Sequence, residues 1–122
     1  MARILIVDDS NLSRRILRSI LEPAGYEIIE AGDGMTALEC HFLQKPDLTI
    51  LDLNMREMAG MEVLTQLRRL DPRARVLIGS ADIQDSTQGM ALAAGAVGFV
   101  GKPFTQAAVL NAVDAALSGG DV

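Results

Sequence analysis

With 122 residues and a mass of 13.0 kDa, the chain has room for one domain with one hydrophobic core, and not for two ordinary domains. Its residues are 49% hydrophobic but only 3% aromatic, so the core must be built from aliphatic side chains. A net charge of −5 excludes nonspecific nucleic-acid binding as the main function. The apolar run near the N-terminus, Ile4 to Val7, is too short for a signal peptide or a membrane span. Cys40 is a single cysteine that cannot form an internal disulfide, so we expect a cytoplasmic protein with no membrane insertion.

Short apolar runs alternate with segments of helical period, and the alternation repeats five times along the chain. The expected strands are Ile4–Val7, Glu27–Glu30, Leu48–Leu51, Arg75–Ile78 and Val97–Val100. Three of these runs lack polar alternation, which is typical of central strands in a parallel sheet that is covered on both faces. The pattern predicts an α/β domain made of five strand–helix units.

Three of the expected helices carry a clear apolar stripe. The stripes consist of Leu12, Ile16, Leu17, Ile20 and Leu21; of Met61, Leu64, Leu67 and Leu70; and of Val109, Ala112, Val113, Ala116 and Leu117. Ser10 or Asn11 is the expected cap of the first helix. Two more helices are expected near residues 34–44 and 85–94, where the pattern is weaker because of Gly89 and the Ala-rich composition.

Polar side chains follow four of the predicted strands at their carboxyl ends. They are Asp8 and Asp9 after the first strand, Asp52 and Asn54 after the third, Ser80 and Asp82 after the fourth, and Lys102 after the fifth. Parallel strands joined by right-handed helical crossovers form an open doubly wound sheet, and such sheets bind ligands at the carboxyl ends of their strands. We therefore expect these side chains to meet at one edge of the sheet.

The chemistry of that edge depends on its three carboxylates. Two carboxylates roughly 5 Å apart, at an effective dielectric constant of about 20, repel each other by about 3 kcal/mol, so the edge needs a cation. Mg²⁺ suits it, because this ion takes one or two carboxylates and leaves positions open for phosphate oxygens. With the metal bound, Asp52 can act as a nucleophile toward phosphorus, and Lys102 and Ser80 can hold the phosphoryl oxygens. His41 stands alone on a predicted helix, so we expect a surface or packing residue rather than a zinc ligand.

Taken together, these motifs resemble the receiver domains of two-component response regulators, and the single-domain chemotaxis type in particular. The resemblance covers essentially the whole chain. It rests on five segments: the acidic pair after Ile4–Val7, the phosphoacceptor segment Asp47–Met55, Gly60, the pair Ser80-Ala81, and Phe99 with Lys102-Pro103-Phe104.

The resemblance implies a flavodoxin-like fold, with five helices around a five-stranded parallel sheet of strand order 2-1-3-4-5. It implies a receiver domain over residues 1–118, followed by a short tail at 119–122. A cis peptide bond is expected before Pro103.

The resemblance also implies the roles of the site residues. Asp52 takes a phosphoryl group from a histidine kinase or phosphotransfer protein, and the domain catalyses this step itself, as a signalling protein rather than a metabolic enzyme. Asp9, Asp52 and the Asn54 backbone carbonyl hold Mg²⁺, and Asp8 assists through water. Ser80 then moves toward the phosphoryl group, and Phe99 turns inward. The fourth helix, fifth strand and fifth helix present the changed surface to a target protein or output domain.

Four positions add detail or depart from the usual pattern of that family. Arg56 stands where the family usually has Pro, and Phe99 lacks the hydroxyl of the more common Tyr. Asn54 and Asp82 occupy the two variable positions beside the site, which in the family set the lifetime of the phosphoryl group.

Alternative interpretations concern the site and one helix. A phosphatase of the haloacid dehalogenase type also uses a strand-end Asp with Mg²⁺, but its second Asp is Asn54 here and the chain has no room for its cap domain. A receiver-like module that signals without phosphorylation is the other alternative. Arg14, Arg15 and Arg18 form a basic strip on the first helix, which we expect to be a solvated face, with docking of an acidic partner as the alternative.

Overall fold

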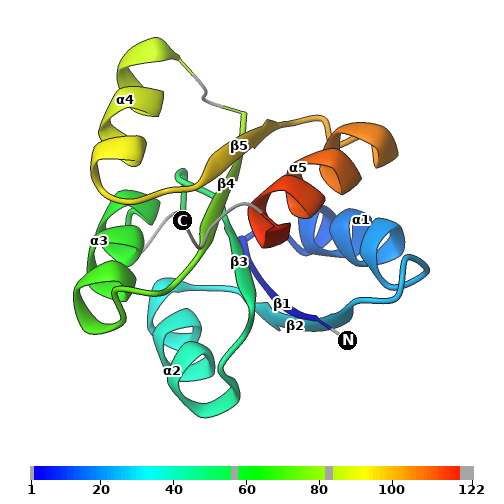
Figure 1. The fold of residues 1–122 in the computed structure, drawn as a ribbon, viewed down its shortest axis with the longest axis horizontal. Coiled ribbons are helices and arrows are strands. Elements are labelled where there is room, and N and C mark those ends of the chain that lie inside the picture. Colours follow the sequence, from blue (N-terminus) through cyan, green and yellow to red (C-terminus); the bar gives the residue numbers. More distant parts are fainter. Residues whose placement is uncertain (1, 56–57, 82–83, 119–122) are drawn as a thin grey trace.

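The computed structural model describes residues 2–55, 58–81 and 84–118, and it shows one parallel sheet between two layers of helices (Figure 1). The strands are β1 (Arg3–Val7), β2 (Glu27–Ala31), β3 (Leu48–Leu51), β4 (Val76–Ser80) and β5 (Gly98–Gly101). Their order in the sheet is β2-β1-β3-β4-β5, and every neighbouring pair is parallel. The predicted fold class and strand order are therefore confirmed.

A helix follows each of the five strands, as predicted. They are α1 (Asn11–Leu21), α2 (Gly34–Gln44), α3 (Gly60–Leu70), α4 (Asp85–Ala93) and α5 (Gln106–Ser118). Helices α1 and α5 cover one face of the sheet, and α2, α3 and α4 cover the other (Figure 1). No helix in the described part of the chain is both long and apolar enough to cross a membrane.

Each face of the sheet has its own aliphatic core. Alternate residues of a strand point to opposite faces, so Ile4 and Ile6 of β1 pack toward α1 and α5, whereas Leu5 and Val7 pack toward α2 and α3. All four side chains are buried. The central strands are therefore apolar on both faces, which explains why their sequences lack polar alternation.

The predicted apolar stripes are correct in their centres and wrong at two ends. Leu17 and Leu21 of α1 and Leu67 of α3 are buried, but Leu12 is 64% exposed and Leu70 is 55% exposed. Leu12 and Leu70 lie in the first and the last turn of their helices. A helix buries its stripe only where the sheet or another helix lies beneath it, so the outer turns leave apolar positions in solvent.

Smaller differences concern boundaries and caps. Ser10, and not Asn11, caps α1, because its side chain accepts a hydrogen bond from the Ser13 N–H. Strand β4 extends to Ser80, which the sequence placed just after the strand. The bond between Lys102 and Pro103 is cis, as expected. The positions Arg56 and Asp82 and the predicted tail at 119–122 lie outside the described residues.

Candidate functional site

Three carboxylates meet at the carboxyl edge of the sheet. One carboxylate oxygen from each of Asp8, Asp9 and Asp52 lies within 4.8 Å of the other two. Asp8 and Asp52 are 2% and 4% exposed, whereas Asp9 is exposed to solvent. The edge therefore combines two buried acidic groups with one that faces water.

The parallel pairing of β1 and β3 produces this arrangement. Val7 is in register with Leu51, so the chain leaves both strands at the same level and Asp8 and Asp52 follow side by side. The Asp52 N–H continues the ladder by donating to the Val7 carbonyl at 2.9 Å. Asp8 and Asp52 are more than forty residues apart in the sequence, but the pairing of β1 with β3 brings them together.

Backbone amides hold two of these carboxylates in place. The Ser10 N–H donates to Oδ1 of Asp8 at 2.9 Å, and the Asn54 N–H donates to Oδ1 of Asp52 at 3.1 Å. In each case the donor lies two residues after the acid, as in an Asx turn. These bonds leave the Oδ2 atoms of both carboxylates facing the centre of the site, where Lys102 meets them.

Lys102 reaches the carboxylates from the end of β5. Its Nζ lies 2.9 Å from Oδ2 of Asp8 and 3.4 Å from Oδ2 of Asp52. Burial of the ammonium favours its neutral form, but the hydrogen bond and charge of Asp8, joined by the charge of Asp52, outweigh this effect and raise the pKa of Lys102. The lysine is therefore a fixed cation between the two buried acids.

One ammonium stands against three carboxyl groups. The site is left with an excess of negative charge and a set of hard oxygen donors, which suits a divalent cation such as Mg²⁺ or Ca²⁺ better than zinc. The residues that are present thus fit a metal site. His41, as expected, is not part of it, since it lies on α2.

The remaining predicted residues lie around this centre. Ser80 is fully buried at the end of β4, and Nδ2 of Asn54 lies 3.5 Å from its Oγ, at the outer limit of a hydrogen bond. Phe99 of β5 is half-buried and packs against the core under α2, α3 and α4. The backbone N–H of Lys102 donates to the Ser80 carbonyl at 3.2 Å, which joins β4 and β5 at the edge.

Gly60 lies against the backbone of the segment that carries Asp52. A Cβ atom at Gly60 would collide with the Asp52 carbonyl oxygen and the Leu53 Cα, and the Gly60 N–H donates to the Leu53 carbonyl at 3.1 Å. Glycine is required here by the close approach of two backbones. The start of α3 therefore rests directly on the acidic segment.

Two features of the structure were not predicted from the sequence. Arg14 is not a solvated side chain, because its guanidinium bonds the Asp8 carbonyl and Glu30 and is only 15% exposed. His41 is a buried residue whose Nε2 lies 2.8 Å from Oδ2 of Asp71, so it ties α2 to the end of α3. For Arg14, the available signal in the sequence was Glu30, because an acidic residue within a strand indicates a cationic side chain nearby.

Comparisons with known proteins agree with this geometry. A family model described as the response regulator receiver domain matches residues 4–114. The chain is 37% identical to the chemotaxis protein CheY of Thermotoga maritima over 113 residues, which covers 92% of this chain and 94% of that protein. It is 38% identical to the chemotaxis protein CheY of Bacillus subtilis over 117 residues, or 95% of this chain and 98% of that one.

A solved structure extends the likeness to three dimensions. The chemotaxis protein CheY4 of Vibrio cholerae matches with a TM-score of 0.92 and 31% identity, and the match covers 96% of this chain and 99% of that one. The fold, the acidic edge and the length of the match all agree with membership of the receiver family. This family implies a histidine kinase as partner. The chain belongs to the response regulator receiver domains, a family that signals through phosphorylation, and it is CheY-like over nearly the whole of the given sequence.

Proposed function

We propose that this domain transfers a phosphoryl group from a phosphohistidine donor to Asp52 and changes its partner-binding surface in response. The observation that carries the proposal is the position of the Asp52 carboxylate. It is 4% exposed, lies within 4.8 Å of the Asp8 and Asp9 carboxylates, and is 3.4 Å from the Lys102 ammonium. Of the three acids, Asp52 is the one at the centre of the sheet edge, since β3 is the middle strand.

In this proposal the cation is Mg²⁺. Asp9, Asp52 and the Asn54 backbone carbonyl would hold it, and Asp8 would assist through water. When bound, Mg²⁺ supplies the positive charge that lets an anionic carboxylate approach an anionic phosphoryl group. The exposure of Asp9 gives a hydrated ion a route to the site.

The transfer step needs little covalent chemistry from the protein. A carboxylate oxygen of Asp52 attacks the phosphorus atom, a new P–O bond forms, and the bond from phosphorus to the donor's nitrogen breaks, with its electron pair staying on nitrogen. Lys102 would donate to one phosphoryl oxygen and the Ser80 hydroxyl to another. Fixed charges directed at the transferred group stabilise the transition state, which is the main source of catalysis in phosphoryl transfer.

The response would begin at Ser80 and Phe99. Ser80 would shift toward the phosphoryl group, and Phe99 would turn into the space that Ser80 leaves. The signal would then reach a target through α4, β5 and α5. A target of the chemotaxis kind is supported by the similarity to the chemotaxis proteins CheY of Thermotoga maritima and Bacillus subtilis. We further propose that the protein is cytoplasmic, where it can meet the kinase.

The test is phosphorylation by acetyl phosphate, followed by intact mass with and without Mg²⁺. We expect the wild type to gain one phosphoryl group only with Mg²⁺, and Asp52→Asn to gain none. Asp114→Asn is a matched control, because this exposed α5 residue loses the same charge outside the site. If the wild type binds Mg²⁺ but stays unmodified, a receiver-like module that signals without phosphorylation becomes the better account.

A further inference from the structure

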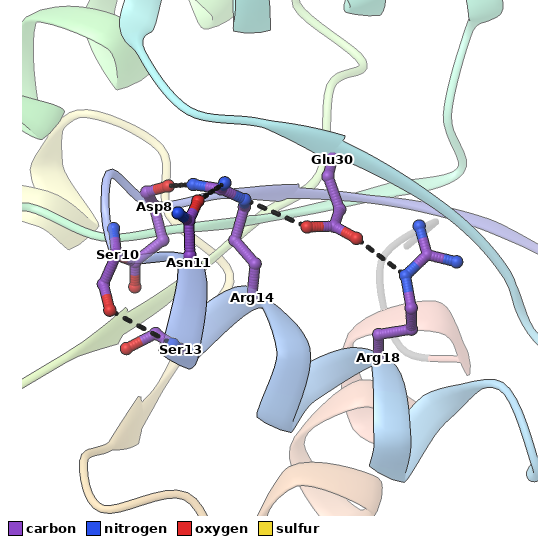
Figure 2. Close-up of polar contacts among 7 residues, drawn as sticks. All are labelled: Asp8, Ser10, Asn11, Ser13, Arg14, Arg18 and Glu30. Atoms are coloured by element: carbon purple, nitrogen blue, oxygen red, sulfur yellow. Dashed lines mark hydrogen bonds and ion pairs between the residues drawn. The ribbon is translucent and has the colours of Figure 1, made fainter.

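The guanidinium of Arg14 lies beside the acidic edge and is held on several sides. Figure 2 shows it between the turn that follows β1 and the outer strand β2, with Asp8 and Asn11 on one side and Glu30 on the other. The side chain is only 15% exposed, although it belongs to the basic strip that the sequence placed in solvent. An arginine buried to this degree is fixed in one position by its partners.

Two of these partners belong to the turn that carries the metal-binding acids. Nη1 of Arg14 donates to the backbone carbonyl of Asp8, and Nη2 donates to Oδ1 of Asn11. The two acceptors bracket the turn, since Asp8 precedes Asp9 and Asn11 begins α1. The guanidinium therefore fixes both ends of the turn from which the Asp8 and Asp9 carboxylates project.

The third partner anchors the guanidinium to the sheet. Nε of Arg14 donates to Oε1 of Glu30 at 2.9 Å, and the other oxygen of Glu30 accepts a bond from Nε of Arg18 at 2.7 Å. Burial of Glu30 opposes ionisation, but the hydrogen bonds from Arg18 and Arg14 outweigh it, and the pKa of Glu30 is lowered. Glu30 is thus an ionised anchor on β2, and bonds between charged groups of this kind are stronger than neutral ones.

The neighbouring backbone leaves space for this arrangement. A Cβ atom at Gly32 would lie 3.3 Å from Nη1 of Arg14, closer than ordinary van der Waals contact. A side chain at this position would press against the guanidinium at the atom that bonds Asp8. The place of Arg14 is therefore defined by the turn, by β2 and by the glycine that follows β2.

We propose that Arg14 is a positioning residue for the divalent-cation site, and that it acts by holding the Asp8–Asn11 turn in the conformation that presents the carboxylates to the ion. The inference rests on the proposed Mg²⁺-dependent function. For the effect of replacing Arg14 on Mg²⁺ affinity, this inference predicts the opposite of what the charge of Arg14 alone would predict. Removing a nearby cation should strengthen binding of Mg²⁺ by simple electrostatics, whereas losing the position of the turn should weaken it.

Arg18 provides the matched control. Arg14→Gln and Arg18→Gln remove the same charge, and each removes one bond to Glu30. In the part of the chain that the structure describes, however, the Arg18 side chain bonds Glu22 and Glu30 rather than the turn, and it lies one helical turn farther along α1. Isothermal titration with MgCl₂ should show about tenfold weaker binding for Arg14→Gln, as expected for an outer-shell residue, and a change within about twofold for Arg18→Gln. With acetyl phosphate, the phosphorylation rate of Arg14→Gln should approach that of the wild type at saturating Mg²⁺.

Amide hydrogen exchange of the metal-free proteins tests the turn without the ion. The Ser10 amide donates to the Asp8 side chain, and the Ser13 amide donates to the Ser10 side chain. Both amides should exchange faster in Arg14→Gln, and their exchange rates should not change in Arg18→Gln. Equal or tighter Mg²⁺ binding in Arg14→Gln, or an unchanged exchange of these amides, would overturn the inference. A wild type that binds no Mg²⁺ would instead overturn the proposed function, and the exchange comparison would still decide the role of Arg14 in the turn.

Discussion

Helices α1 and α4 both follow strands that end at the acidic edge, yet they are held in very different ways. Ser10 caps α1, Leu17 and Leu21 are buried beneath it, and Arg14 ties it to the acidic turn. Within residues 84–118, α4 has no side-chain cap at Gln84 and buries only Ala91.

This difference separates an anchored region from a loosely held one. Elements with few buried apolar side chains and weak helix ends open at low free-energy cost, and such elements are the ones that move in switching proteins. Helix α1 and its turn keep the acidic pair Asp8 and Asp9 in place. In the proposed function, we expect helix α4 and β5 to be the part of the molecule that responds to phosphorylation of Asp52.

The largest effect is expected at Gly60, in the anchored part of the molecule. In Gly60→Ala the new methyl group would collide with the backbone of Asp52 and Leu53, and neither backbone can move without disturbing the acidic edge. We expect a loss of about 3 kcal/mol in the free energy of unfolding, measured by urea denaturation, because overpacking against backbone is at the upper end of such costs. A loss below about 1 kcal/mol would show that the edge is less rigid than we describe.

The two helix caps provide a direct comparison. Ser10→Ala removes the side-chain acceptor of the Ser13 N–H and should lower the free energy of unfolding by about 1 kcal/mol. Gln84→Ala removes no such bond and should change it by less than about 0.3 kcal/mol, as for an ordinary surface substitution. Thermal unfolding of both variants measures the difference, and equal losses would contradict the distinction between α1 and α4.

A substitution at Gly89 should reduce the difference in stability between α1 and α4. It lies in the middle of α4, and a Cβ atom there would meet nothing within 4 Å. Gly89→Ala should therefore raise the free energy of unfolding by about 0.7 kcal/mol through helix propensity alone. Urea denaturation measures the gain, and slower hydrogen exchange within residues 85–93 should accompany it. A loss of stability would mean that α4 is packed more tightly than its exposure indicates.

The smallest effect concerns the pH dependence of Glu30. Its pKa is lowered in the folded protein, so its contribution is fully present above the ordinary pKa of a glutamate and is lost as the pH falls through the lower folded value. Glu30→Gln should cost about 0.5 kcal/mol at pH 7, as for a partly exposed ion pair, and progressively less below about pH 4.5. Unfolding measured at pH 7, 5 and 3.5 tests this, and a cost that grows on acidification would contradict it.

Much of the fold and of the site followed from the sequence because both depend on local patterns. Apolar runs without alternation mark the buried strands, and residues directly after parallel strands must share an edge, so Asp8, Asp52 and Lys102 meet as predicted. Helix stripes predict which face is buried but not how far the sheet extends under it, which is why Leu12 and Leu70 were placed wrongly.

The features that were missed depend on side-chain reach between elements. Arg14 and Glu30 are sixteen residues apart, and nothing in their local sequence says that the guanidinium turns toward β2 rather than solvent. The same holds for His41 and Asp71, which meet across α2 and α3. Long polar side chains have many rotamers, and only the packed structure selects one.

The most direct test of the account is hydrogen exchange measured by mass spectrometry in Mg²⁺, with and without a continuous supply of acetyl phosphate. Asp52→Asn under the same conditions is the control. We expect phosphorylation to change exchange within residues 84–101, which contain α4 and β5, while α1 keeps its protection. A change confined to α1, or the same change in Asp52→Asn, would contradict the account.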